Sequence, residues 1–100
     1  MVNMGTKMKK LLEIVDDLAA YDDELTIYAC KPWSCDSVAI VAREPDAGGL
    51  PPEAVSCGAE YFIEIFVAKE FLEGWVSNES APPTVNAQCD RLIHYAEFDA

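Results

Sequence analysis

Apolar residues recur at helical spacing at the start of the chain. The i, i+3, i+4, i+7 stripe over residues 7–20 consists of Met8, Leu11, Leu12, Val15, Leu18 and Ala19. This stripe predicts an amphipathic helix over residues 7–20, with Thr6 as its N-cap. Asp16 and Asp17 lie off the stripe, so we expect them to face water.

Three shorter apolar runs have the composition of strands. Residues 25–30 (LTIYAC) and 37–43 (SVAIVAR) flank a loop at 31–36, in which Pro32 prevents regular strand pairing. These two runs are predicted to pair as an antiparallel hairpin. Residues 61–66 (YFIEIF) predict a third strand.

The apolar period changes again at Val67. Val67, Phe71 and Trp75 form an i, i+4 row, which indicates a helix. A last helix is predicted over residues 83–97, and a short helical turn over 52–56 inside the Gly- and Pro-rich connection.

These elements predict one α+β domain over residues 1–100, with 1–6 disordered or vector-derived. The expected core is a three-stranded, mainly antiparallel sheet packed against about three helices, in the order α-β-β-β-α-α.

The charge is unevenly distributed along the chain. The formal net charge is −11, but from Leu11 onward four basic residues oppose all eighteen acidic ones, which gives −14. Such a field disfavours direct binding to nucleic acid and to anionic membranes, and it favours a basic protein partner. A charge that serves only solubility is the alternative.

The sequence predicts a cytoplasmic protein with free thiols. No run approaches the roughly 18–20 apolar residues of a membrane span, and Glu13, Asp16 and Asp17 interrupt any signal-peptide core. Cys30 and Cys35 form only a loose pair among the four cysteines, so no zinc site is expected. A secreted disulfide scaffold would need a secretion signal and a lower apolar content, so it is not expected either.

No motif indicates catalysis or a cofactor. Asp36, Ser37 and His94 contain the groups of a hydrolase triad, but no G-x-S-x-G elbow surrounds Ser37. An enzyme would require His94 to meet Ser37 or a cysteine. The Gly48-Gly49 pair lacks the phosphate-loop lysine, and no calcium-loop motif occurs. We therefore predict no catalytic residue, no cofactor, no metal site and no enzymatic activity.

Two residues depart from the pattern of their surroundings. Glu64 lies among apolar neighbours, so it either reaches a sheet edge or finds a donor such as Arg43, a backbone amide or a partner. Trp33 lies in a Pro-containing loop, where it is either an interface anchor or a lid over the core.

Two segments, IYACKPWSCDSVAIVA and GAEYFIEIFVAKEFLEGW, resemble a family of small acidic bacterial proteins without a settled activity. The shared pattern is a Pro-Trp-x-x-Asp-Ser turn between two strands and a Gly-x-x-Tyr strand that leads into a helix. The resemblance covers roughly residues 8–77, and its matching positions are Pro32, Trp33, Asp36, Ser37, Gly58 and Tyr61. By size and charge, it implies an immunity protein or an inhibitor.

The leading hypothesis is a stoichiometric binder that blocks a basic surface of a toxin or a nucleic-acid-binding complex. The predicted partner-binding residues are Asp16, Asp17, Asp22, Asp23, Glu24, Trp33, Asp36 and Glu64. The alternatives are a phage-type nucleic-acid mimic of the anti-CRISPR kind and a homodimer that pairs through a sheet edge.

Overall fold

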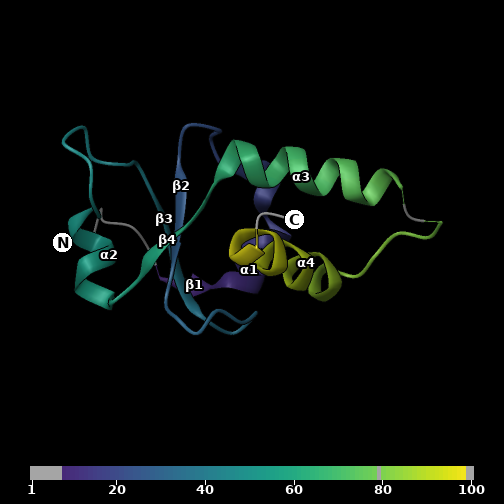
Figure 1. The fold of residues 1–100 in the computed structure, drawn as a ribbon, viewed down its shortest axis with the longest axis horizontal. Coiled ribbons are helices and arrows are strands. Elements are labelled where there is room, and N and C mark those ends of the chain that lie inside the picture. The colour runs from purple at the N-terminus through teal and green to yellow at the C-terminus, as the bar shows by residue number, and fades with distance from the viewer. Residues whose placement is uncertain (1–7, 79, 99–100) are drawn as a thin grey trace.

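A computed structural model describes residues 8–78 and 80–98 of the chain. Within these residues the fold is α+β, with an antiparallel sheet in the order β1 (Lys9–Lys10), β3 (Val38–Ala42), β2 (Thr26–Ala29), β4 (Glu60–Glu64). One side of the sheet is covered by α1 (Leu11–Asp16), α3 (Ile65–Ser77) and α4 (Val85–Phe98), and the other side by α2 (Pro52–Cys57) (Figure 1). The α+β class and the antiparallel sheet are confirmed, whereas the prediction of three strands is wrong, because the sheet has four.

The additional strand comes from the segment that was predicted to begin the first helix. β1 (Lys9–Lys10) pairs with β3, and α1 (Leu11–Asp16) starts only after it. The loop holds this boundary, since the Leu11 N–H donates to the Ser37 carbonyl and the Leu12 N–H to that of Cys35. The predicted cap Thr6 lies outside the described residues.

The first helix also ends earlier than its apolar stripe predicts. At Asp17 the backbone leaves the helix, and the 3₁₀ helix η1 (Leu18–Ala20) follows. Two consecutive aspartates are poor helix formers, and their charge opposes the negative end of the helix dipole. The stripe is still used, because Leu11, Val15 and Leu18 are buried.

The predicted hairpin is confirmed as β2 (Thr26–Ala29) and β3 (Val38–Ala42), paired antiparallel. Alternate residues of β2 face opposite sides of the sheet. Ile27 joins the larger core under the three helices, whereas Tyr28 joins the smaller core with Ala54 of α2 (Pro52–Cys57). Gly58 ends α2 with φ 76°, a left-handed conformation that glycine adopts without strain.

The third predicted strand is shorter than its apolar run. β4 (Glu60–Glu64) pairs with β2 at the edge of the sheet, and α3 (Ile65–Ser77) begins directly after it. The Ile65 N–H donates to the Leu25 carbonyl at 2.9 Å, which ties the start of α3 to the start of β2.

The last predicted helix is present as α4 (Val85–Phe98), with Cys89, Leu92 and Ile93 buried. Phe71 of α3 stacks on Tyr95 of α4 with ring centroids 4.2 Å apart, so the two helices are packed against each other. No helix in residues 8–78 and 80–98 has the length and apolar character needed to cross a membrane.

Candidate functional site

Carboxylates gather at the end of the sheet where β2 begins. Because β2 is antiparallel to both neighbours, Thr26 lies opposite Ala42 of β3 and Glu64 of β4. The residues just outside these strand ends therefore meet. Together they line a cavity of about 430 Å³, here called the acidic cavity, whose lining residues are Asp23, Glu24, Leu25, Thr26, Glu44, Glu64 and Phe66.

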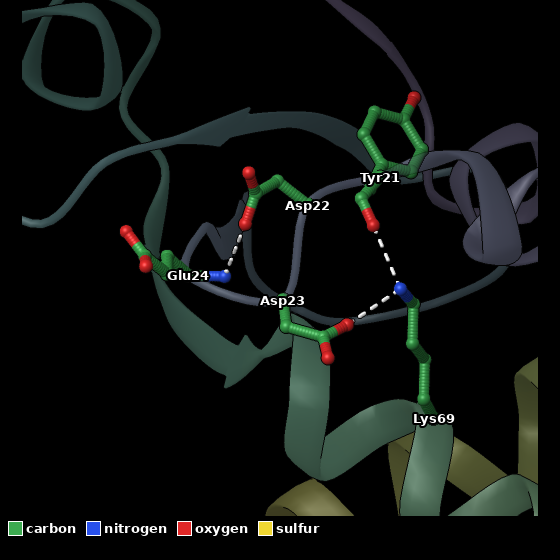
Figure 2. Close-up of polar contacts among 5 residues, drawn as sticks. All are labelled: Tyr21, Asp22, Asp23, Glu24 and Lys69. Carbon is green, nitrogen blue, oxygen red and sulfur yellow. Dashed lines mark hydrogen bonds and ion pairs between the residues drawn. The ribbon is translucent and has the colours of Figure 1, made fainter.

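Two of the predicted aspartates shape the turn that precedes β2. The Asp22 carboxylate accepts a hydrogen bond from the Glu24 N–H at 2.9 Å, which closes a local turn. Lys69 reaches from α3 and donates to the Asp23 carboxylate at 2.6 Å and to the Tyr21 carbonyl at 2.7 Å (Figure 2). Asp22 and Asp23 therefore have structural partners in the folded chain.

The other three carboxylates of the acidic cavity differ in whether they are paired. Glu24 forms an ion pair with Arg43 at 3.0 Å between largely exposed side chains. Glu44 and Glu64 form neither an ion pair nor a side-chain hydrogen bond among the described residues. Counting Lys69 and Arg43 against the four acids leaves a formal charge of −2 at the cavity.

Glu64 is the last residue of β4, at the edge of the sheet. The residue is half-buried at the end of an edge strand, so its position agrees with a carboxylate that reaches a sheet edge. Arg43, which was considered as its donor, instead pairs with Glu24.

A buried tyrosine lies on the sheet face beneath these carboxylates. Tyr28 is 1% exposed, and its hydroxyl has no hydrogen-bond partner of regular geometry in the described part of the chain. Burial raises the pKa of Tyr28, the charges of Glu44 and Glu64 raise it further, and the adjacent Thr26 side chain opposes the rise. Both glutamates are thus within electrostatic reach of this hydroxyl.

Two exposed aromatic rings stand beside the same carboxylates. Phe66 lines the acidic cavity and is 44% exposed. Tyr61 is 46% exposed and meets the Tyr28 ring edge-on, with centroids 6.3 Å apart. Burial and then the charge of Glu64 raise the pKa of Tyr61, which places this ring near the same acid.

The remaining predicted acids of the first helix lie beside a different hollow. Asp16 lines a cavity of about 410 Å³ between η1, α3 and α4, together with Lys69 and Glu73. Asp17 is exposed, and its N–H donates to the Glu13 carbonyl at the end of α1. The pair formed by Lys69 and Asp23 joins the two hollows, since each residue lines one of them.

Trp33 and Asp36 lie at the opposite end of the hairpin from the acidic cavity, because the length of β2 separates them from Glu24. The Trp33 indole N–H donates to the Ala29 carbonyl at 3.1 Å, and its ring meets Phe62 edge-on with centroids 4.8 Å apart. Asp36 pairs with Lys10 at 3.7 Å. These contacts make Trp33 a half-buried part of the fold, and the structure does not bring it together with the acids before β2.

Of the other groups considered for chemistry, Ser37 has a structural role in this loop, and His94 lies on α4. The buried Ser37 hydroxyl donates to the Pro32 carbonyl at 3.1 Å and accepts from the Ser34 N–H at 2.9 Å. His94 is exposed on α4, with its ring 4.9 Å from that of Phe98.

The four cysteines are free thiols, and they are arranged differently from the pair that the sequence suggests. Cys30 donates to the Cys57 carbonyl at 3.2 Å, whereas Cys35 lies against Cys89 and Asp90. Burial raises the pKa of Cys35 and of Cys89, so both thiols stay protonated near neutral pH. No group of three or more His, Cys, Asp or Glu residues within residues 8–78 and 80–98 is arranged to hold a metal ion.

Sequence reasoning missed several residues around the acidic cavity, namely Tyr28, Glu44, Tyr61 and Phe66. A signal for Glu44 was present, because an antiparallel hairpin places the residues before its first strand beside those after its second. Glu24 and Glu44 occupy these two positions around β2 and β3. The burial of the Tyr28 hydroxyl has no comparable signal in the sequence.

No protein-family model, curated protein or solved structure matches this chain.

Proposed function

We propose that this protein is a cytoplasmic, non-enzymatic module that binds a basic surface of a partner protein and blocks it, in the manner of an immunity protein or an inhibitor. The observation that supports the proposal best is the acidic cavity. It places the carboxylates of Glu44 and Glu64, which form no ion pair among the described residues, beside the exposed ring of Phe66. A surface that combines negative charge with aromatic rings suits a cationic protein surface.

The net charge strengthens this argument in kinetic terms. A body with a charge of −14 from Leu11 onward attracts a basic partner before contact, which raises the association rate at low salt. The acidic cavity then supplies the place where the attraction is strongest. The resemblance to small acidic bacterial proteins remains a prediction about origin, and it agrees with this role.

A capture experiment tests the proposal in cells that naturally make the protein. The bait is the full chain, and it is compared with the double variant Glu44→Gln/Glu64→Gln and with the matched control Glu53→Gln/Glu97→Gln. Both double variants remove the same charge, but only the first changes the acidic cavity. We expect one basic protein that the wild type and the control retain and the cavity variant loses.

The captured protein is then purified, and its affinity is measured between about 0.05 and 0.5 M salt, a range over which exposed charges become screened. We expect a stoichiometric complex that weakens with salt and that loses about tenfold or more in affinity in the cavity variant. Capture of no basic protein, or an affinity that salt leaves unchanged, would overturn the proposal.

A homodimer is the second candidate, and the exposure of Tyr61 on edge strand β4 favours it. Light scattering at several protein concentrations distinguishes the two, since self-pairing predicts a mass that doubles without any partner.

A further inference from the structure

Two buried side-chain polar atoms of the described residues lack a hydrogen bond of regular geometry, the Tyr28 hydroxyl and Arg91 Nε, and the hydroxyl is the one beside residues of the acidic cavity. A buried hydroxyl without a hydrogen bond destabilises the folded chain, and a phenylalanine at the same position would avoid that cost. The hydroxyl belongs to a residue that is 1% exposed in the smaller core, where its neighbours Ile40, Ala42 and Ala54 are apolar. Such a group points to a ligand that would pair with it.

The Tyr28 hydroxyl lies close to three residues that line the acidic cavity, although Tyr28 itself is not part of the lining. Thr26 is two residues earlier on the same sheet face, and it lines the cavity together with Glu44 and Glu64. The charges of Glu44 and Glu64 act on the Tyr28 hydroxyl, and the Thr26 side chain lies close enough to lower its pKa, although the two groups form no hydrogen bond of regular geometry. A group that enters between the two glutamates therefore approaches the hydroxyl from the cavity side.

Glu44 is a side chain near the hydroxyl that can move without losing a contact. The Tyr28 oxygen itself is covered, so a ligand reaches it only when a neighbouring side chain turns aside. Glu44 is exposed and makes no ion pair or side-chain hydrogen bond among the described residues. It is therefore able to rotate toward an incoming cation without breaking a contact.

The chemistry of the cavity selects the kind of cation. The described residues offer no metal-binding cluster, which argues against a bare metal ion. A guanidinium group has five N–H donors in one plane, which suits two separate carboxylates and a hydroxyl acceptor at once. Its flat faces also stack on aromatic rings, and Phe66 exposes such a ring in the cavity.

We propose that the acidic cavity receives the side chain of an arginine residue, with Glu44 and Glu64 accepting hydrogen bonds from its guanidinium group, Tyr28 accepting another, and Phe66 covering one face. The source is the partner protein, so in that respect the inference rests on the proposed function. Free arginine is a poorer occupant, because the field of the acidic body repels its carboxylate. The cavity volume of about 430 Å³ is within the usual range for a site of this size.

The test uses the full chain and small probes that do not depend on the partner. N-acetyl-arginine amide, the corresponding lysine and citrulline amides and free arginine are titrated into ¹⁵N-labelled protein. We expect the arginine amide to bind about fivefold or more tightly than the lysine amide, because only the guanidinium group satisfies several acceptors at once. Its shifts should centre on Thr26, Glu64 and Phe66. The uncharged citrulline amide should not bind, and free arginine should bind more weakly than its amide.

Matched variants assign the contacts. Tyr28→Phe should weaken binding of the arginine amide about threefold to tenfold, the loss expected for one hydrogen bond to a charged group. Glu64→Gln should weaken it at least as much, and Glu97→Gln on α4 should leave it unchanged. Tyr28→Phe removes an unpaired group, so the variant is expected to fold, and its thermal unfolding confirms this independently.

Three results would overturn the inference: equal affinity for arginine and lysine amides, unchanged affinity in Tyr28→Phe, or the same loss in Glu97→Gln as in Glu64→Gln. The outcomes that would overturn the proposed function are different from these. If the arginine amide binds as expected but no basic partner is captured, the guanidinium site stands and the proposed function does not. If a basic partner binds equally well to wild type, Glu64→Gln and Tyr28→Phe, the inference is overturned and the proposed function stands.

Discussion

The two ends of the central hairpin differ in how their polar groups are used. At the loop end, the Trp33 indole, the Ser37 hydroxyl and the Asp36 carboxylate each have a partner within the chain. At the acidic end, Glu44 and Glu64 form no ion pair or side-chain hydrogen bond among the described residues, and the Tyr28 hydroxyl has no hydrogen bond of regular geometry there. A polar group that already has a partner stabilises the fold, whereas one that lacks a partner leaves room for a ligand.

The Pro-Trp-x-x-Asp-Ser pattern of the sequence marks the loop end of the hairpin and not the candidate site. Its most recognisable residues, the Pro-Trp turn and Ser37, lie at the loop end, where their contacts hold β2, β3 and the start of α1 together. They explain how the chain folds. The candidate site lies at the other end, in residues that no motif marks.

The largest expected effect is on the loop end. Trp33→Ala should lower the free energy of unfolding by about 3 kcal/mol, because it removes the edge-on contact with Phe62 and the hydrogen bond to Ala29. Chemical denaturation measures the change, and Asp36→Asn, which alters only an exposed ion pair, is the control. A loss below about 1 kcal/mol combined with weaker partner binding would instead make Trp33 an interface anchor.

Removing one buried hydroxyl at each end gives the sharpest comparison. Ser37→Ala should destabilise the protein by about 1–2 kcal/mol, since it leaves the Ser34 N–H without its acceptor. Tyr28→Phe should stabilise it by about 1 kcal/mol, since it removes an unpaired hydroxyl from an apolar core. Urea unfolding of both variants under the same conditions measures the opposite signs. Destabilisation by Tyr28→Phe would show that the hydroxyl has a partner in the free protein.

The sequence predicts more of the fold than of the site, for a physical reason. Periodicity reports which faces are buried, so the hairpin, β4, α3 and α4 follow from residues such as Ile27 and Leu92. It does not report where a backbone finds its hydrogen bonds, and β1 exists because Lys9 and Lys10 pair with Ala39 and Val38. The acidic cavity depends on strand register and on the burial of one oxygen atom, neither of which the apolar pattern contains.

The pH dependence of stability tests the packing of the loop against α4. Cys89 is fully buried beside Cys35, and burial raises its pKa above the ordinary value of 9.0. As pH rises past 9, the thiol ionises in the unfolded chain but not in the folded one, so the folded state holds more protons and loses stability. The expected loss from this group is about 1.4 kcal/mol by pH 10.

Cys89→Ala removes this ionisable group and should flatten the stability curve between about pH 8 and 10 relative to wild type. The measurement is urea unfolding at several pH values, with Cys57→Ala as the control on the other face of the sheet. Parallel curves for wild type and Cys89→Ala would mean that water reaches the thiol, and that the loop packs less closely on α4 than its contacts indicate.

The smallest expected effect concerns the charge of the acidic end. Glu44→Gln should raise the free energy of unfolding by a few tenths of a kcal/mol at low salt, because it relieves repulsion from Glu24 and Glu64 around the same cavity. The gain should fade toward about 0.5 M salt, where exposed charges are screened. Glu53→Gln, which removes a charge near the positive end of the α2 dipole, should give no gain.

A gain in stability that persists at high salt would have a cause other than charge repulsion. An equal gain in Glu44→Gln and Glu53→Gln would mean that the net charge of the whole protein acts and that the acidic cavity has no special role. Only a salt-sensitive gain confined to Glu44 supports the view that the acidic end of the hairpin holds its carboxylates together at a cost in stability, which a cationic partner would relieve.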